Sequence, residues 1–94
     1  MAMTFEIVYH HLVVSSDIPK LPPPWREQVR RAIEDKLTTR PEVFGKPLRR
    51  SLKGYRKLRV GDYRVIFRIE ERIVKVLVIQ HRSIAYTNVV KRIL

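Results

Sequence analysis

The stretch "KGYRKLRVGDYRVIFR", residues 53–68, decides the fold, because two strand-like runs flank the pair Gly61-Asp62. Two-residue loops are the commonest connection in β-hairpins. The pairs that such a loop produces are Val60–Tyr63, Arg59–Arg64, Leu58–Val65, Lys57–Ile66, Arg56–Phe67 and Tyr55–Arg68. The stretch therefore predicts an antiparallel hairpin with a defined register.

This register sorts the side chains by charge, because paired residues share a face and successive pairs alternate between faces. One face is apolar, with Arg56 as its only misfit: Val60, Tyr63, Leu58, Val65 and Phe67. The other is basic: Lys57, Arg59, Arg64 and Arg68, with Tyr55 and Ile66. Arginine holds phosphate with two hydrogen bonds and tyrosine stacks on bases, so the basic face is predicted to bind RNA. An ordinary solvated sheet face is the alternative.

The charge of the whole chain points to the same class of partner. Its 94 residues carry a formal net charge of +11, and no acidic residue falls between Val43 and Gly61. A basic run of this kind indicates a polyanionic partner, either nucleic acid or a strongly acidic protein segment. A basic surface kept for solubility is the alternative. The RNA-binding residues predicted from this run and the hairpin are Arg50, Lys53, Tyr55, Arg56, Arg59 and Arg68.

Several classes of site and location are excluded. Cysteine is absent, which excludes disulfides and thiolate metal sites. We expect His10 and His11 to point to opposite faces of a strand, so no metal site and no cofactor are predicted. No apolar run is long enough to span a membrane, and the N-terminus lacks the pattern of a signal peptide, so a cytoplasmic location is expected.

The remaining chain completes an α+β domain that spans residues 1–94. Residues 4–10 alternate as a strand, and residues 24–37 carry a helical apolar stripe that ends before Pro41. Residues 11–24 have room for one short helix, and residues 38–54 are expected to form a loop. Residues 72–81 form a nearly continuous apolar strand after a turn at Glu70-Glu71, so we expect this strand to be central. The fold predicted is a small, mainly antiparallel four-stranded sheet with N-terminal helices on one side and a short C-terminal helix over 83–94.

A catalytic group is suggested by the residues that end the last strand. His81 and Arg82 lie there, and Tyr86 follows. Cleavage of RNA without a metal requires a base for the 2′-hydroxyl, cations for the phosphorane and an acid for the 5′-oxygen, and these residue types supply such groups. A strand-end histidine with a hydrogen-bond partner is the alternative for His81.

In the order and spacing of its motifs, nearly the whole chain resembles the RelE-like branch of the RelE/ParE toxin superfamily. The motifs are "DIPKLP", the helix, "GKPLRRSLKGYRKLRVGDYRVIFRI", the apolar strand, "HRSIAY" and "VVKRIL". The resemblance implies an mRNA endoribonuclease that acts in the ribosomal A site by 2′-hydroxyl attack without metal. It also implies the family fold, a small sheet with helices packed on one side.

By position, the resemblance implies four catalytic residues: Lys57, Arg64, Arg82 and Tyr86. Lys57 would help to deprotonate the 2′-hydroxyl, the two arginines would hold the scissile phosphate, and Tyr86 would stack on or orient the base. The chain departs from the family at Tyr55, where a second lysine is usual, so Arg56 or His81 is a candidate to replace it. His81 is therefore kept as a candidate acid or base.

The implied partners are mRNA, the ribosome and an acidic antitoxin that folds as it covers the basic face. Two other functions compete. A ParE-like inhibitor of DNA gyrase would have no need for the four catalytic residues together. A non-catalytic RNA-binding protein of the same fold is the third alternative, for which the change at Tyr55 would be the first sign.

Overall fold

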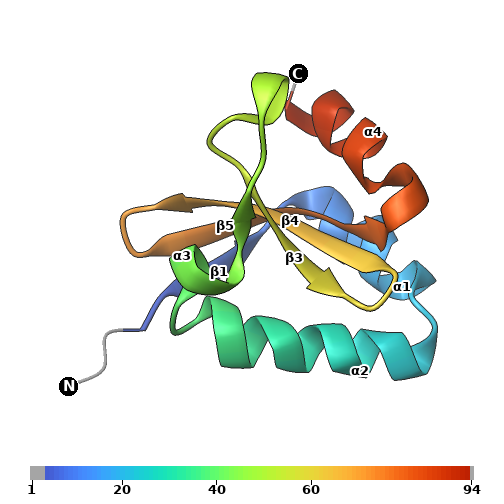
Figure 1. Cartoon of the computed structure of the whole chain (residues 1–94). Helices are drawn as coiled ribbons and strands as arrows, with labels where there is room; N and C mark the ends of the chain where they lie inside the picture. The colour runs from blue at the N-terminus through green and yellow to red at the C-terminus, as the bar shows by residue number, and fades with distance from the viewer. Residues whose placement is uncertain (1–3, 94) are drawn as a thin grey trace.

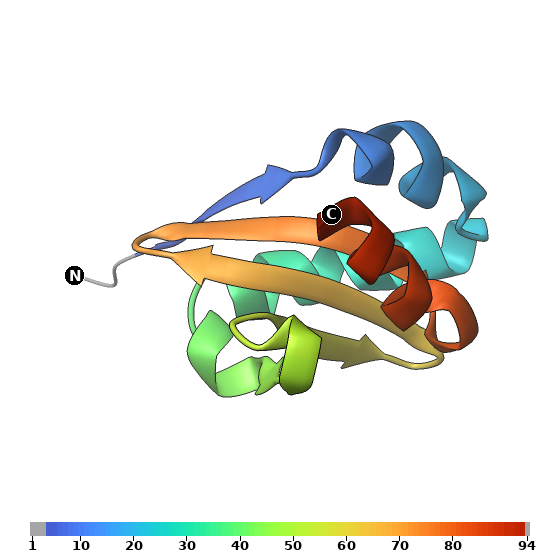
Figure 2. The same ribbon diagram turned by 90° about the horizontal axis from the view of Figure 1, so that it is seen from above.

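Five strands form one sheet in the order β1-β5-β4-β3-β2 in the computed structural model, which describes residues 4–93. Only the pair β1–β5 is parallel. Figure 1 and Figure 2 show the helices α2 and α4 on opposite faces of this sheet. The elements in chain order are β1 (Glu6–Tyr9), the π-helical turn η1 (Val13–Asp17), α1 (Ile18–Lys20), α2 (Pro23–Ala32), the π-helical turn η2 (Ile33–Leu37), α3 (Pro41–Phe44), β2 (Lys46–Pro47), the 3₁₀ turn η3 (Arg50–Leu52), β3 (Arg56–Val60), β4 (Tyr63–Glu70), β5 (Ile73–His81) and α4 (Arg82–Ile93).

The hairpin β3–β4 has the predicted register. All the predicted pairs from Val60–Tyr63 to Arg56–Phe67 are present, and the pair Tyr55–Arg68 lies beyond the end of β3. The apolar face of the hairpin packs against α2, so burial on that side specifies the register.

The larger core lies between the sheet and α2 and confirms the predicted helical stripe. Val29, Ile33 and Leu37 come from α2 and η2 and are at most 2% exposed. The core residues are Val13, Leu21, Val29, Ile33, Leu37, Leu58, Val65, Phe67, Val74, Val76 and Ile79. Full burial of one such aliphatic side chain stabilises the fold by about 1.5–3 kcal/mol, so this layer dominates the packing energy.

The opposite face of the sheet is covered by α4, which begins one residue before the segment 83–94 expected to form a short helix. Leu94 lies outside the described residues. Ala85 and Val89 of α4 are buried against Ile66 of β4 and Val78 of β5. The part of the basic face nearest α4 is therefore covered by this helix.

Three details of the expected fold were wrong. The sheet has five strands instead of four, because residues 38–54 contain α3, the two-residue strand β2 and η3 as well as loop. β5 lies inside the sheet between β1 and β4 and is buried on both faces, as expected for a central strand. The turn before β5 consists of Glu71-Arg72. The rings of His10 and His11 are stacked 4.4 Å apart, because the strand ends there and a helical turn begins.

A β-bulge in β5 changes which face its last residues occupy. Phe67 pairs with Val76 and Ile66 pairs with Val78, so Leu77 is the extra residue. An extra residue reverses the alternation of every side chain that follows it. Val76 and Ile79 consequently face the same core, which explains why the apolar run of β5 is nearly continuous.

The free edge of β5 is closed by an ion pair. β1 covers β5 only as far as Val76, and η1 follows the rest of that edge. The carboxylate of Asp17 accepts a hydrogen bond from the Ile79 N–H at 3.0 Å. It also forms an ion pair with Arg92 of α4, at a distance of 2.6 Å. Arg92 also donates to the carbonyl of Leu77 at 2.7 Å. These bonds satisfy strand-edge groups that have no β-sheet partner.

Replacement of Gly61 by alanine is expected to destabilise the fold. Gly61 has φ +58°, and an added Cβ would lie 2.3 Å from the ring of Trp25. The left-handed backbone alone costs an alanine about 1 kcal/mol, and the clash adds to this. The clash predicts that Gly61→Ala loses at least about 1 kcal/mol more in the wild-type background than in a Trp25→Ala background, measured by urea unfolding. Equal losses in the two backgrounds would show that the ring does not restrict this turn.

Among residues 4–93, no helix has the length and apolar character needed to cross a lipid bilayer.

Candidate nucleic-acid interface

A cleft of about 230 Å³ lies at the open edge of β3, where the short strand β2 ends. It is formed by η2, α3, β2, β3 and β4. Its lining residues are Lys36, Phe44, Lys46, Lys57, Leu58, Arg59 and Arg64. Two of these, Lys57 and Arg64, are predicted catalytic residues, and Arg59 is a predicted RNA-binding residue.

The lining of this cleft is strongly cationic. Five of the seven lining residues are lysine or arginine, and within residues 4–93 no carboxylate lies at ion-pair distance from any of them. Water screens exposed cations incompletely when they share a concave surface, so the cleft attracts anions.

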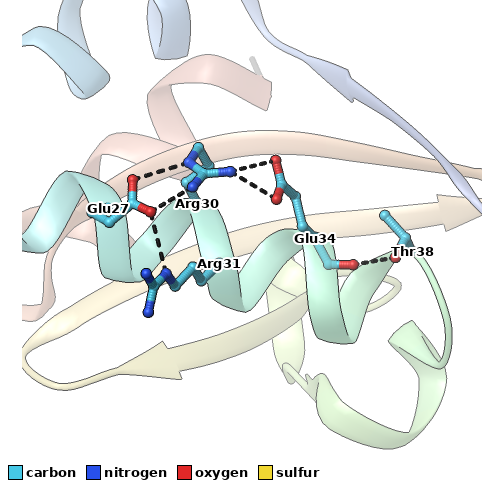
Figure 3. A network of polar contacts seen from close by, with 5 residues as sticks. All are labelled: Glu27, Arg30, Arg31, Glu34 and Thr38. Carbon is cyan, nitrogen blue, oxygen red and sulfur yellow. Dashed lines mark hydrogen bonds and ion pairs between the residues drawn. The ribbon is translucent and has the colours of Figure 1, made fainter.

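The exposed face of α2 shows the opposite arrangement (Figure 3). Arg30 donates to Glu34 at 2.8 Å and to Glu27, and Arg31 donates to Glu27 at 3.2 Å. The hydrogen bond from Arg30 lowers the pKa of Glu27, and the same contact raises the pKa of Arg30. Arg30 and Arg31 are thus paired with carboxylates of α2 and η2, in contrast to the cations that line the cleft.

Arg64 is held at the cleft by the turn between β3 and β4. Its side chain is 8% exposed, and its Nη1 donates to the carbonyls of Gly61 and Tyr63 at 2.9 Å. Arg82 is bound to the same turn by two contacts with Asp62. Its backbone amide donates to the Asp62 carbonyl at 2.8 Å, and its guanidinium lies 3.9 Å from the Asp62 side-chain carboxylate. One turn therefore positions two of the predicted catalytic arginines.

Tyr86 lies on α4 beside the cleft. The Nζ atom of Lys57 is 5.7 Å from the centre of the Tyr86 ring, at cation–π distance. The ring also packs on the smaller core under α4, so its position is fixed by the helix. The structure thus brings Lys57 and Tyr86 together, and Lys57 and Arg64 line one cleft.

His81 lies on the other face of the sheet. It pairs with Tyr63, and the two rings are 5.7 Å apart, whereas Arg64 pairs with Gln80. The bulge at Leu77 is the physical reason, because unbroken alternation would place His81 on the face of Arg64. The Nδ1 atom of His81 accepts a hydrogen bond from the Ser83 amide at 3.2 Å, so this histidine is engaged at the start of α4.

The other predicted RNA-binding residues are dispersed. Arg59 is exposed in the cleft, and Arg50 and Lys53 are exposed in and after η3. Tyr55 and Arg68 contact each other at cation–π distance, 6.0 Å, in a separate depression next to β1.

Arg56 turns its guanidinium into the protein. It donates to the carbonyls of Glu42 at 3.2 Å and Gly45 at 2.8 Å, which explains its place on the apolar face of the hairpin.

Sequence reasoning missed Lys36, Phe44 and Lys46 as lining residues. Lys36 and Phe44 belong to segments interpreted as a helix surface and a loop, and no periodicity connects them with the hairpin. Of these three residues, only Lys46 had a signal in the local sequence, because it is the first cation of the stretch between Val43 and Gly61 that contains no acidic residue.

No group of three or more histidine or acidic side chains gathers as a metal site within the described range, residues 4–93. The chemistry available at the cleft is that of lysine, arginine and tyrosine, which bind phosphate and stabilise developing negative charge.

A protein-family model covers most of the chain. The family model of the ParE toxin of type II toxin–antitoxin systems matches residues 14–86. The chain belongs to the RelE/ParE toxin superfamily. The matched residues run from η1 to Tyr86, so they contain the whole hairpin and the cleft.

Two curated relatives of this toxin are RelE-like members. The toxin RelG of Mycobacterium tuberculosis is 38% identical over 72 residues, which cover 74% of this chain and 83% of RelG. The toxin RelE of the same organism is 31% identical over 83 residues, which cover 83% of this chain and 86% of RelE.

Solved structures share the fold. The toxin–antitoxin complex RelBE2 from M. tuberculosis matches with a TM-score of 0.79 and 30% identity, covering 88% of this chain and 97% of that one. The RelB–RelE complex from Methanococcus jannaschii matches in fold, with a TM-score of 0.65 and 17% identity over 86% of this chain and 96% of that one. The predicted RelE-like α+β architecture is confirmed.

Proposed function

We propose that this toxin is a ribosome-dependent endoribonuclease that cuts mRNA in the A site. The observation that carries the proposal is the cationic cleft at the edge of β3, which is lined by Lys57 and Arg64 and lies beside Tyr86. Such a cleft suits a strand of RNA whose phosphates supply the counter-charges.

The reaction proposed is attack of a ribose 2′-oxygen on the adjacent phosphorus. A base removes the 2′-hydroxyl proton, the new P–O bond closes a 2′,3′-cyclic phosphate, and the bond to the 5′-oxygen breaks as that oxygen takes a proton from the protonated base. Lys57 is assigned to accept the first proton. Arg64 and Arg82 stabilise the negative charge that develops on the phosphorane oxygens, and Tyr86 orients the nucleotide.

His81 has no assigned step in this proposal. Its ring lies on the face of Tyr63, and its Nδ1 is already engaged with Ser83. In place of the lysine that is absent at Tyr55, we assign a supporting role to two of the cations that share the cleft with Lys57, namely Lys46 and Arg59.

The partner proposed for this toxin is an acidic antitoxin. The comparison structures from M. tuberculosis, M. jannaschii and Pyrococcus horikoshii are RelB–RelE type complexes, which supports a protein partner of the same class. An acidic segment of such a partner would compete with RNA for the cations of the cleft.

Primer extension on mRNA in a reconstituted ribosome with an open A site tests the enzymatic proposal. We expect discrete cuts with the wild type and a loss of about 10-fold or more with Tyr86→Phe, because the hydroxyl that orients the reacting nucleotide is removed. Tyr9→Phe is the matched control, since it deletes the same group from β1 and is expected to cut like the wild type.

Inhibition of DNA gyrase is the second candidate, and the match to the ParE toxin model favours it. A folded wild type that makes no A-site cuts but blocks supercoiling by gyrase would overturn the ribonuclease proposal. The cleft would then serve as a docking surface. A protein that binds RNA but shows neither activity would be the non-catalytic member of the fold.

A further inference from the structure

Phe44 is a large aromatic residue left exposed in the cleft. It ends α3 and is 42% exposed, whereas Phe67 is fully buried and Phe5 is half-buried. Single exposed apolar residues are ordinary on protein surfaces. Phe44 differs because it lines the same cleft as Lys57 and Arg64 and is surrounded there by cations.

The support beneath Phe44 is rigid. The Gly45 N–H donates to the carbonyl of Pro41 at 2.9 Å and closes the turn of α3. Arg56 donates to the carbonyls of Glu42 and Gly45 at the end of that turn. At Gly45, an added Cβ would lie 2.2 Å from the ring of Phe67, so α3 sits directly on the core. The hydrogen bonds of Arg56 and the close contact of Gly45 with Phe67 thus hold the one-turn helix α3 in place, although its last residue, Phe44, is exposed to solvent.

The surroundings of the ring select the kind of ligand. The Nζ atom of Lys36 lies over the ring, 5.6 Å from its centre. Among the described residues that line the cleft, Leu58 is the only other apolar one, and the rest are cations. An apolar protein segment would leave these charges unpaired, whereas a nucleotide brings a flat base and a phosphate together. Base–aromatic stacking combined with cations along the backbone is the usual arrangement for single-stranded nucleic acid.

We propose that Phe44 is a nucleobase-binding site, on which a base of single-stranded RNA stacks while the adjacent phosphate is held by the cations of the cleft. This inference rests on the proposed function, since it takes RNA as the ligand. It assigns to α3 a part in holding RNA that lies outside the predicted catalytic residues.

The test uses a short RNA that cannot be cleaved, with 2′-O-methyl riboses throughout and one 2-aminopurine base. Stacking on an aromatic ring quenches 2-aminopurine fluorescence, and anisotropy of a labelled copy gives the Kd. We expect the wild type to quench the probe and Phe44→Ala to weaken binding by about 10-fold or more and to abolish the quench. Phe44→Trp is expected to retain both signals.

Val43→Ala is the matched control, because Val43 is the neighbouring residue of α3, is 64% exposed and does not line the cleft. Its Kd and quench should equal those of the wild type. Urea unfolding of each variant shows that the fold is retained, which exposed positions permit. An unchanged Kd and quench in Phe44→Ala would overturn the site, as would equal affinity for an RNA that lacks the base.

Two further outcomes distinguish base stacking from simple attraction of charge and from RNA cleavage. Polyglutamate that displaces the RNA equally well from the wild type and from Phe44→Ala would show that the cleft recognises charge alone, and would overturn the base site. Because the probe cannot be cut, a quench that depends on Phe44 together with an absence of A-site cuts would support the base site and reject the ribonuclease proposal. If the wild type did not quench the probe and A-site cuts persisted in Phe44→Ala, the base site would be rejected and the ribonuclease proposal supported.

Discussion

Replacement of Arg64 by alanine is expected to reduce A-site cleavage of mRNA by about 100-fold or more, the effect of removing one donor to a developing oxyanion. Arg64 is nearly buried, is fixed by the carbonyls of Gly61 and Tyr63 and lines the cleft. A guanidinium held in this way needs no reorientation when charge develops on the phosphate. Single-turnover cleavage on programmed ribosomes measures the effect.

Two control variants separate the role of Arg64 from general charge. Arg59→Ala removes the exposed arginine that pairs with Arg64 across the hairpin, and its effect is expected to stay below about 10-fold because an exposed cation contributes mainly to attraction. Arg64→Lys keeps the charge but loses the two-pronged geometry, so it should remain strongly impaired. Cleavage by Arg64→Lys at the wild-type rate would show that only the charge matters. Folding is checked by the urea midpoint, because the bonds to the turn are also lost.

Asp17→Asn is expected to destabilise the fold by about 3–5 kcal/mol, the usual cost of breaking a buried ion pair. Asp17 is 2% exposed, and its carboxylate receives bonds from Arg92, Gln80 and the amide of Ile79. Removal of its charge leaves the guanidinium of Arg92 buried without a counter-ion. Urea unfolding at pH 7 measures the loss, and Glu27→Gln, which breaks an exposed ion pair of α2, should change the midpoint little.

The same carboxylate makes the stability depend on pH in a defined direction. Burial opposes ionisation of Asp17, but the hydrogen bonds from Arg92, Ile79 and Gln80 outweigh it and lower its pKa. A lowered pKa in the folded state stabilises the fold fully above the unfolded value of about 4, and this contribution disappears as the pH falls through the folded value. The wild type should therefore lose stability more steeply below pH 4 than Asp17→Asn. If the free energy of unfolding fell equally steeply below pH 4 in both proteins, a lowered pKa of Asp17 in the folded state would be contradicted.

The hairpin could be predicted residue by residue because its signals are local. Gly61-Asp62 sets the loop length, and the alternation on either side sets the register, so only one pairing buries Leu58 and Val65. The apolar stripe of α2 was predictable for a similar reason, since the spacing of its apolar residues places them all on one side of a helix.

The remaining features depend on contacts that are distant in sequence. The bulge at Leu77 has no sequence mark, yet it moves His81 to the opposite face from Arg64. The one-turn helix α3 is too short to show periodicity, so Phe44 was not recognised as part of the cleft. Arg56 was a misfit on an apolar face until its carbonyl partners on α3 were known.

The ion pair of Asp17 and Arg92 also bears on the kinetics of the molecule. The two residues are 75 positions apart, so bringing them together costs chain entropy before any bond is gained. We expect a contact of this kind to form after the transition state of folding, when the sheet is already assembled. Interactions absent from the transition state govern the unfolding rate and leave the folding rate unchanged. We therefore expect the pair at the edge of β5 to determine how long a folded toxin molecule persists, and the local signals of the hairpin to determine how quickly one is made.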